Sequence, residues 1–279
     1  MTTRPGGNRA LVVLDFSGTL SVEAPQFAAP ETLEERLRDS GLWELGIDSP
    51  RLFWERLINP TWHRGSTTID GYATVLTAAA AGVLHERGRD VPPATIELAA
   101  AAFAGQYFAH SPIAPQWHAC LRRLHDLNDV ALVIATDHYA EATAHITAEL
   151  AGLGLDGMPV TSAAPTSGQL LIANSADIGH HKTTGEFWER VRHALGDDTV
   201  APLILVDDFG ANEADAAGYA ERERIRRRSR ATRAALSMVF GVAPHVVSFV
   251  LAPNATPDDL AGMVAAAERS TMTVLSNHP

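Results

Sequence analysis

The chain has 279 residues, a length that suits one domain carrying an insertion better than two large domains. Its formal net charge of −11 argues against nucleic acid as a partner, and its 46% of hydrophobic residues is ordinary for a globular protein. Arginine supplies all but one of the 22 basic side chains, so Lys182 is a candidate for a role that arginine fills badly.

The single cysteine and the N-terminal sequence bear on the compartment. Cys120 has no partner for an intramolecular disulfide, which is typical of a reducing environment. The first ten residues, MTTRPGGNRA, lack the apolar segment of a signal peptide. No apolar run approaches the roughly 18–20 residues of a membrane span. We therefore expect a cytoplasmic protein that does not act on membranes.

Four apolar runs have the length of β-strands, and β-branched residues recur in each of them. In chain order the runs are residues 11–14, 131–135, 203–206 and 246–251. Helical patterns lie between the runs, and this alternation is typical of a parallel sheet covered by helices on both faces. We expect an α/β fold whose ligands bind beyond the carboxyl ends of the strands.

More than a hundred residues separate the first two runs, far too many for a single crossover. Apolar periodicity within this segment predicts helices over residues 31–45, 51–58, 69–86 and 94–109. The stretch SPIAP (111–115) then leads back to the sheet. We predict a mostly helical cap, residues 21–111, inserted into a core formed by residues 1–20 and 112–279.

Two further helices are predicted in the second half of the chain. ERERIRRRSRATR (221–233) contains seven arginines and predicts a long basic helix, which we interpret first as a solvated face. Contact with an acidic patch on a partner subunit, or with nucleic acid, is an alternative for this helix, so a homodimer stays open. TPDD (256–259) combines a threonine N-cap, a proline and an acid, and predicts the start of the last helix.

Polar residues follow the apolar runs at the places where a ligand would bind. In chain order they are Asp15, Ser17, Gly18 and Thr19, then Thr136 and Asp137, then Lys182 in GHHKT, then Asp207 and Asp208, and finally Asn212 and Glu213. Each residue type is common in turns and helix caps, so none is informative alone. Together they supply two groups of oxygen ligands, a hydroxyl and an ammonium, which suits phosphoryl chemistry.

The roles follow from the chemistry of each group. Asp15 can attack phosphorus as a nucleophile, and Mg²⁺ bound by Asp15 and Asp208, with Asp207 close by, can screen the negative charges. We also expect a phosphate site. In it, Thr136 and the backbone at Gly18 would donate hydrogen bonds, Lys182 would supply a point charge, and Asp137 would lie alongside.

At these residues the chain resembles the haloacid dehalogenase-like (HAD) superfamily. The matching residues, in the family's order, are DFSGT (15–19), Thr136, Lys182 and VDD (206–208). The resemblance implies a Rossmann-like core with a cap between the first two motifs. It also implies an aspartyl-phosphate at Asp15, usually in a phosphatase of small phosphorylated metabolites. The implied Mg²⁺ ligands are Asp15, the Ser17 carbonyl and Asp208.

Ser17 departs from the family's pattern. Phosphatases of this superfamily carry an aspartate there, which protonates the leaving oxygen and then activates water. A serine hydroxyl does this poorly, and loss of a general acid–base is worth about 10²–10⁴ in rate. A hydrolase with another proton donor therefore stands beside two alternatives: a catalytically impaired binding or regulatory module, and a phosphotransferase or dehalogenase-type relative.

Two of the family's other chemistries fit less well. A dehalogenase-type enzyme works without metal, and Asp207 and Asp208 would then crowd an anionic substrate. A phosphonatase-type enzyme needs a lysine in the cap, and residues 21–111 contain none.

The cap offers candidate residues for choosing the substrate. The loop NPTWHRGSTT (59–68) contains Trp62, His63 and Arg64, and Trp54 shortly precedes it. An aromatic ring with an arginine can hold a ring and an anion. A surface loop anchored by one tryptophan is the equally good alternative.

Overall fold

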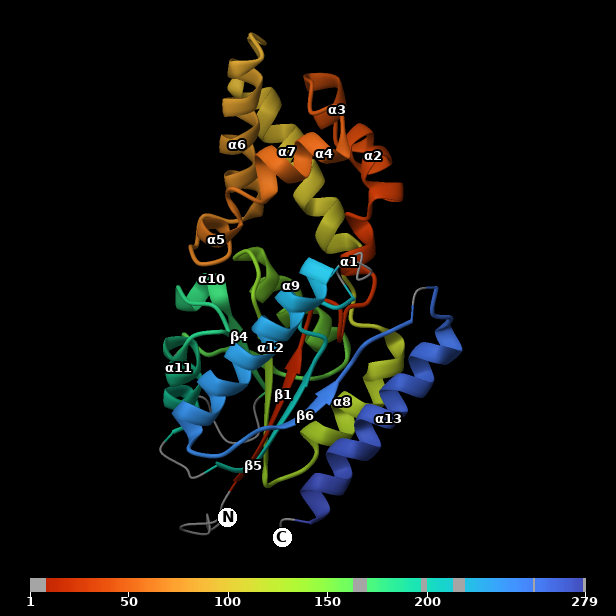
Figure 1. The fold of residues 1–279 in the computed structure, drawn as a ribbon, viewed down its shortest axis with the longest axis vertical. Helices are drawn as coiled ribbons and strands as arrows, with labels where there is room; N and C mark the ends of the chain where they lie inside the picture. Colours follow the sequence, from red (N-terminus) through yellow and green to blue (C-terminus); the bar gives the residue numbers. More distant parts are fainter. Residues whose placement is uncertain (1–8, 163–169, 197–199, 213–218, 253, 278–279) are drawn as a thin grey trace.

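A computed structural model describes residues 9–162, 170–196, 200–212, 219–252 and 254–277. Six parallel strands form one sheet in the order β3-β4-β2-β1-β5-β6 (Figure 1). The strands are β1 (Arg9–Asp15), β2 (Val130–Thr136), β3 (Gly157–Pro159), β4 (Leu170–Asn174), β5 (Val200–Asp207) and β6 (His245–Ser248). The expected α/β fold is confirmed as a Rossmann-like parallel sheet, and all four predicted strands are present.

Two strands, β3 and β4, were not predicted from the sequence. β3 has only three residues and contains a glycine and a proline, which both weaken a strand signal. β4 contains the apolar run Leu170–Ala173 and is buried throughout, so its signal was present in the sequence. It extends the sheet beyond β2 and carries Asn174 at its end.

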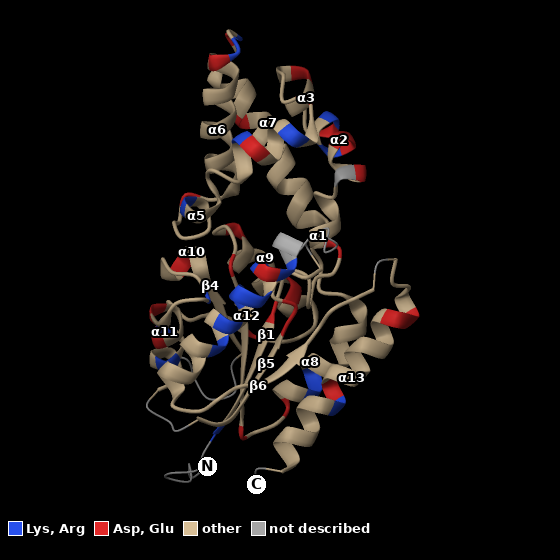
Figure 2. Ribbon diagram, viewed as in Figure 1, with Lys and Arg blue, Asp and Glu red and all other residues tan. Residues whose placement is uncertain are grey.

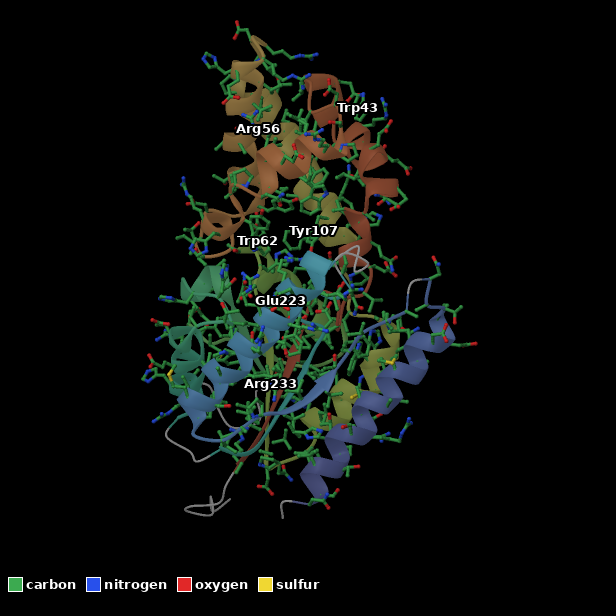
Figure 3. All side chains as sticks on the ribbon, in the orientation of Figure 1. Trp43, Arg56, Trp62, Tyr107, Glu223 and Arg233 are labelled. Atoms are coloured by element: carbon green, nitrogen blue, oxygen red, sulfur yellow. The ribbon has the colours of Figure 1, made fainter. Side chains whose placement is uncertain are left out.

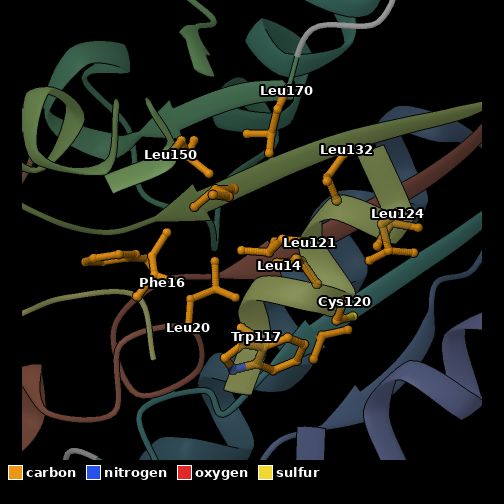
Figure 4. Packing of buried hydrophobic residues seen from close by; sticks show 14 of the residues in the cluster. Leu14, Phe16, Leu20, Trp117, Cys120, Leu121, Leu124, Leu132, Leu150 and Leu170 are labelled. Atoms are coloured by element: carbon orange, nitrogen blue, oxygen red, sulfur yellow. The ribbon is translucent and has the colours of Figure 1, made fainter. Parts of the chain in front are cut away.

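The sheet is buried on both faces, which explains the near-continuous apolar runs. Along β1, Val12 and Leu14 pack into one hydrophobic cluster, whereas Leu11 and Val13 pack into another. The first cluster is completed by helices α8 (His118–His125), α9 (Glu141–Gly152) and α13 (Pro257–Ser276), and Figure 4 shows Leu14 packed near Trp117 and Leu121 of this side. Helices α11 (Gly185–Leu195) and α12 (Tyr219–Phe240) complete the second cluster.

The segment between β1 and β2 is helical and has a hydrophobic core of its own. Its elements are α1 (Ala24–Phe27), α2 (Pro30–Asp39), α3 (Leu42–Leu45), α4 (Pro50–Leu52), the π-helix η1 (Phe53–Ile58), α5 (Trp62–Gly65), α6 (Tyr72–Glu86) and α7 (Pro93–Ala109). They stand beyond the carboxyl ends of the strands (Figure 1). The predicted helix 31–45 is divided at Gly41, whose φ of +84° ends α2 and precedes α3. The cap limits 21–111 stay a prediction.

The cap rests on the loop that follows β2. Tyr139 of that loop belongs to the hydrophobic cluster of the cap, and its ring stacks on that of Tyr72 with centroids 4.2 Å apart. Glu141 accepts hydrogen bonds from the backbone N–H groups of Tyr72 (2.7 Å) and Ala73 (3.4 Å), at the N-terminus of α6. A carboxylate there also opposes the positive end of the helix dipole.

The remaining connections include the short helices η2 (Pro115–Trp117) and α10 (Ser175–Ile178). The predicted capping box of the last helix is present, with Thr256 and Asp259 bonded reciprocally. The predicted basic helix is α12, along which Figure 2 shows blue basic residues. Among the described helices, none combines the length and apolar character needed to cross a bilayer.

Candidate active site

The first, second and fourth motifs meet at one edge of the sheet. β1 ends at Asp15, β2 at Thr136 and β5 at Asp207, and Asp15 pairs in register with Ala135. Because parallel strands end at the same edge, this packing brings the predicted residues together. All three side chains are buried.

Lys182 joins this edge from the loop that precedes α11. Its ammonium donates hydrogen bonds to Asp15 Oδ1 and to Asp207 Oδ2, the latter at 3.0 Å, and only 1% of the lysine is exposed. Asp208 completes the group, since one carboxylate oxygen from each of the three aspartates lies within 4.8 Å of the others. One ammonium therefore faces three buried carboxylates.

The electrostatics reflect this imbalance. Burial raises the pKa of Asp15 well above its ordinary value, and the charges of Asp207 and Asp208 add to the effect while Lys182 opposes it. Burial alone would lower the pKa of Lys182, but the carboxylates of Asp15 and Asp207 raise it above its ordinary value. Lys182 is thus charged, and the excess of carboxylates favours a bound cation.

The turn after β5 gives its two aspartates different surroundings. Asp207 Oδ1 accepts the Phe209 N–H at 2.6 Å, and its other oxygen faces Lys182. The carboxylate of Asp208 accepts the N–H groups of Gly210 (2.9 Å) and Asn212 (2.7 Å). Asp207 therefore binds the lysine, whereas the backbone N–H groups of the turn after β5 orient the carboxylate of Asp208.

The DFSGT loop is shaped around Asp208. Gly18 has a φ of +80°, and a Cβ added there would lie 2.5 Å from Asp208 Oδ2. The Gly18 N–H donates to the Ser21 carbonyl at 2.9 Å. The N–H of Gly18 itself is thus used within the loop, while the glycine supplies room and turn geometry. That the turn presents backbone N–H groups to a phosphate stays a prediction.

Two polar side chains tie the loop in place. Asn212 Nδ2 donates to the carbonyls of Gly18 (2.6 Å) and Phe249 (2.9 Å), linking the first motif to the turn after β5 and to the end of β6. Thr19 Oγ1 donates to Asp15 Oδ2 at 3.3 Å. Glu213, singled out with Asn212 in the sequence, lies outside the described residues.

Asp137 contacts both the lysine loop and α12. Its Oδ1 accepts the backbone N–H of Lys182 at 2.8 Å, and its Oδ2 lies 3.4 Å from Arg228 Nη2. One oxygen thus positions the lysine loop and the other faces Arg228, and the predicted place of Asp137 beside a phosphate stays a prediction. Arg228 was not predicted, because nothing distinguishes it from its neighbours in the arginine run.

The cap contributes some of the predicted substrate residues to this region. The rings of Trp62 and Tyr139 meet edge to face at 5.4 Å, and His63 meets His181, the residue before Lys182, at 5.1 Å; Figure 3 labels Trp62 above the core. Arg64 instead pairs with Asp70 at 3.0 Å and is 78% exposed. Trp54 packs against Phe53 within the cap.

One polar pair between cap and core was missed by the sequence reasoning. The hydroxyl oxygen of Tyr107 in α7 lies 2.8 Å from His138 Nε2. His138 Nδ1 accepts the Tyr139 N–H, so Nε2 carries the proton and donates to Tyr107. Burial and the nearby His145 lower the pKa of His138 to about 4, which keeps the imidazole neutral.

Comparison with known proteins was informative only for solved structures, because no family model and no curated protein matches the chain. It is similar to the L-2-haloacid dehalogenase PA0810, with 14% identity over 93% of this chain and all of that one, and a TM-score of 0.45. A "predicted HAD-like family hydrolase from Porphyromonas gingivalis" is 12% identical over 90% of this chain and 96% of that one, with a TM-score of 0.44. The 2-haloacid dehalogenase from Pseudomonas syringae pv. tomato DC3000 is 18% identical over 92% of this chain and 98% of that one, with a TM-score of 0.43.

At these levels of identity and overlap, the three proteins say nothing about the activity of this chain. The parallel sheet, the inserted helices and the four motifs at one edge agree with the resemblance seen in the sequence. The fold shown is an α/β fold with a Rossmann-like parallel sheet and an inserted helical segment. The chemistry must be argued from the site of this chain itself.

We predict that Gly18→Ala lowers the free energy of unfolding by about 1–3 kcal/mol, because a side chain at positive φ is strained and collides with Asp208. Urea unfolding would measure it. Gly82→Ala is the matched control, since its added Cβ meets nothing within 4 Å. In α6 that change should stabilise by about 0.5–1 kcal/mol. Equal effects of both substitutions would contradict this account of Gly18.

We predict that Mg²⁺ raises the melting temperature more at pH 8 than at pH 6. The pKa of Asp15 is raised in the folded protein, so stability is lost as pH rises from the ordinary carboxyl pKa up to that raised value. A cation removes this cost but must compete with protons at lower pH. Thermal unfolding at constant ionic strength would test it, with Asp208→Asn as the control that abolishes the shift. A larger shift at pH 6 would contradict the prediction.

Proposed function

We propose that the protein is a Mg²⁺-dependent phosphohydrolase that acts on a small phosphorylated metabolite through an aspartyl-phosphate at Asp15. The observation that carries the proposal is the buried group of three carboxylates, two of which accept from the Lys182 ammonium, at the edge of a parallel sheet. A phosphorylated substrate brings further negative charge, so a cation is required for it to bind there.

Asp15 is the residue best suited to attack phosphorus. It ends β1, where a strand buried on both faces fixes its backbone, and Lys182 and Thr19 hold one oxygen each. The ammonium of Lys182 neutralises part of the charge on Asp15 and lies where it can also meet a phosphoryl oxygen. Thr136, at the end of the neighbouring strand, is the proposed hydroxyl donor.

The donor set fits a magnesium ion, which prefers carboxylate and carbonyl oxygens. Asp15, Asp208 and the Ser17 carbonyl would hold it, as the resemblance implies, and Asp207 would stand beside them with one oxygen on Lys182. When bound, the ion would offset the repulsion between nucleophile and phosphate and polarise the phosphoryl group.

The charge distribution disfavours the dehalogenase-type alternative. A haloacid carries a carboxylate, which would meet Asp15, Asp207 and Asp208 with a single lysine to offset them. Without a metal that arrangement repels the substrate, since like charges in a buried site interact strongly. The impaired binding module stays an alternative because of Ser17.

We predict that wild-type protein releases phosphate from a panel of phosphorylated metabolites only with Mg²⁺, and that Asp15→Asn abolishes release. The amide keeps the shape of the carboxylate but is not a nucleophile. Malachite-green assays would measure turnover, and circular dichroism would verify folding. Asp70→Asn, an acid of the cap surface, is the control that should keep activity. Turnover by folded Asp15→Asn would exclude Asp15 as nucleophile, and silence of the wild type across the panel would favour the binding module.

We predict that Ser17 makes breakdown of the aspartyl-phosphate slower than its formation. An activated aryl phosphate should then give a burst of about one phenol per site before slow turnover. Ser17→Asp should raise the steady rate by up to about 10²–10⁴, and only with Mg²⁺, because the new charge lies beside Asp15. Stopped-flow absorbance would resolve both phases. An unchanged or lower rate would point to another proton donor.

A further inference from the structure

A groove of about 650 Å³ lies between α12 and β6, beside the proposed catalytic edge. One wall consists of Arg226, Ser229, Arg230 and Arg233, which follow the i, i+3, i+4, i+7 spacing of a single helix face. The opposite wall consists of the alternating residues Val246, Ser248 and Val250. Figure 3 labels Glu223 and Arg233, which mark the extent of the lined face along α12.

The groove borders the turn that carries the fourth motif. Asp208 and Phe209 contribute to its lining. The carboxylate of Asp208 is engaged by the N–H groups of Gly210 and Asn212, and it lies against Gly18. The groove is therefore a neighbour of the proposed metal site.

Its arginines are arranged to receive an anion. Glu223 pairs with Arg230 at 2.9 Å and reaches Arg226 at 3.9 Å, which orients both guanidinium groups. The lining holds three guanidinium groups against the two carboxylates of Glu223 and Asp208, and Arg233 is exposed at the other end of the row. A concentration of positive charge on a chain of net charge −11 is selective for anions, and guanidinium groups bind phosphate or carboxylate in a bidentate manner.

The rest of the lining is apolar. Val246, Val250 and Ile225 contribute hydrocarbon surface, and Val250 is 46% exposed. The volume lies within the roughly 300–1,000 Å³ range of small-molecule sites. A bare inorganic ion would leave this surface uncovered.

We propose that this groove binds an organic anion, with its phosphate or carboxylate on Arg230 and Arg233 and its apolar body against β6. Two sources share this chemistry: a second anionic group on the substrate of the neighbouring site, or a separate small anion. The binding itself does not depend on the proposed phosphohydrolase activity.

Isothermal titration with 1-naphthylphosphonate, which cannot be hydrolysed, tests the site in the presence of EDTA. Without metal, Asp15 and Asp207 of the neighbouring edge repel the probe. Asp208 borders both sites, so the arginine variants decide whether the heat comes from the groove. We expect one site per chain, weakened about tenfold by Arg230→Gln or Arg233→Gln, since a charge-assisted hydrogen bond is worth at least that factor. Arg227→Gln, an exposed arginine of the same helix outside the groove, should leave the affinity unchanged.

Glu223→Gln should change the affinity for the probe in the opposite direction. It removes the acid that competes for Arg226 and Arg230, so the probe should bind several-fold more tightly. Absence of binding, equal weakening by Arg227→Gln, or an unchanged affinity in both Arg230→Gln and Arg233→Gln would overturn the proposal.

Steady-state kinetics with Mg²⁺ distinguishes the two sources. If Arg233→Gln raises KM for substrates with a second anionic group and leaves KM for singly anionic ones unchanged, the substrate occupies the groove. If Arg233→Gln changes only the affinity for 1-naphthylphosphonate and no KM value, a separate small anion occupies the groove. A protein that binds the probe but releases no phosphate would refute the proposed function and keep the groove.

Discussion

The pairing of Lys182 with Asp15 and Asp207 is the interaction on which the candidate active site depends. Each buried carboxylate would cost several kcal/mol if left without a partner, so the ammonium permits β1 and β5 to end on acids inside the fold. Its own position is enforced from the backbone. Asp137 accepts the Lys182 N–H, and Trp188 Nε1 donates to the Lys182 carbonyl at 2.7 Å.

Three carboxylates lie together at this edge, and Lys182 donates to two of them, Asp15 and Asp207, while Asp208 lies against the DFSGT loop. Burial and the two neighbouring aspartates raise the pKa of Asp15, so a bound cation would favour its ionised form. On the cap surface, by contrast, Arg64 and Asp70 form a simple pair of opposite charges.

The strands and the motif residues could be predicted from sequence because both follow local rules. Buried parallel strands are continuous apolar runs, and the residue after such a run lies at the binding edge, which located Asp15, Thr136 and Asp207. Which side chain or backbone group each motif residue pairs with in the folded protein follows no local rule. That Asp137 holds the lysine loop, and that Arg228 reaches Asp137, depends on how α12 lies over segments almost a hundred residues earlier.

The seating of the cap has a kinetic consequence. Tyr139 stacks on Tyr72 and Glu141 caps α6, yet both residues belong to the segment that leads from Thr136 into α9. Lifting the cap must break these contacts and pull on the strand end that bears Thr136. If products leave by cap opening, that opening would be a discrete step. It would set the upper limit on turnover only once breakdown of the aspartyl-phosphate is fast, and it would depend on two tyrosines and a glutamate that touch no reacting atom.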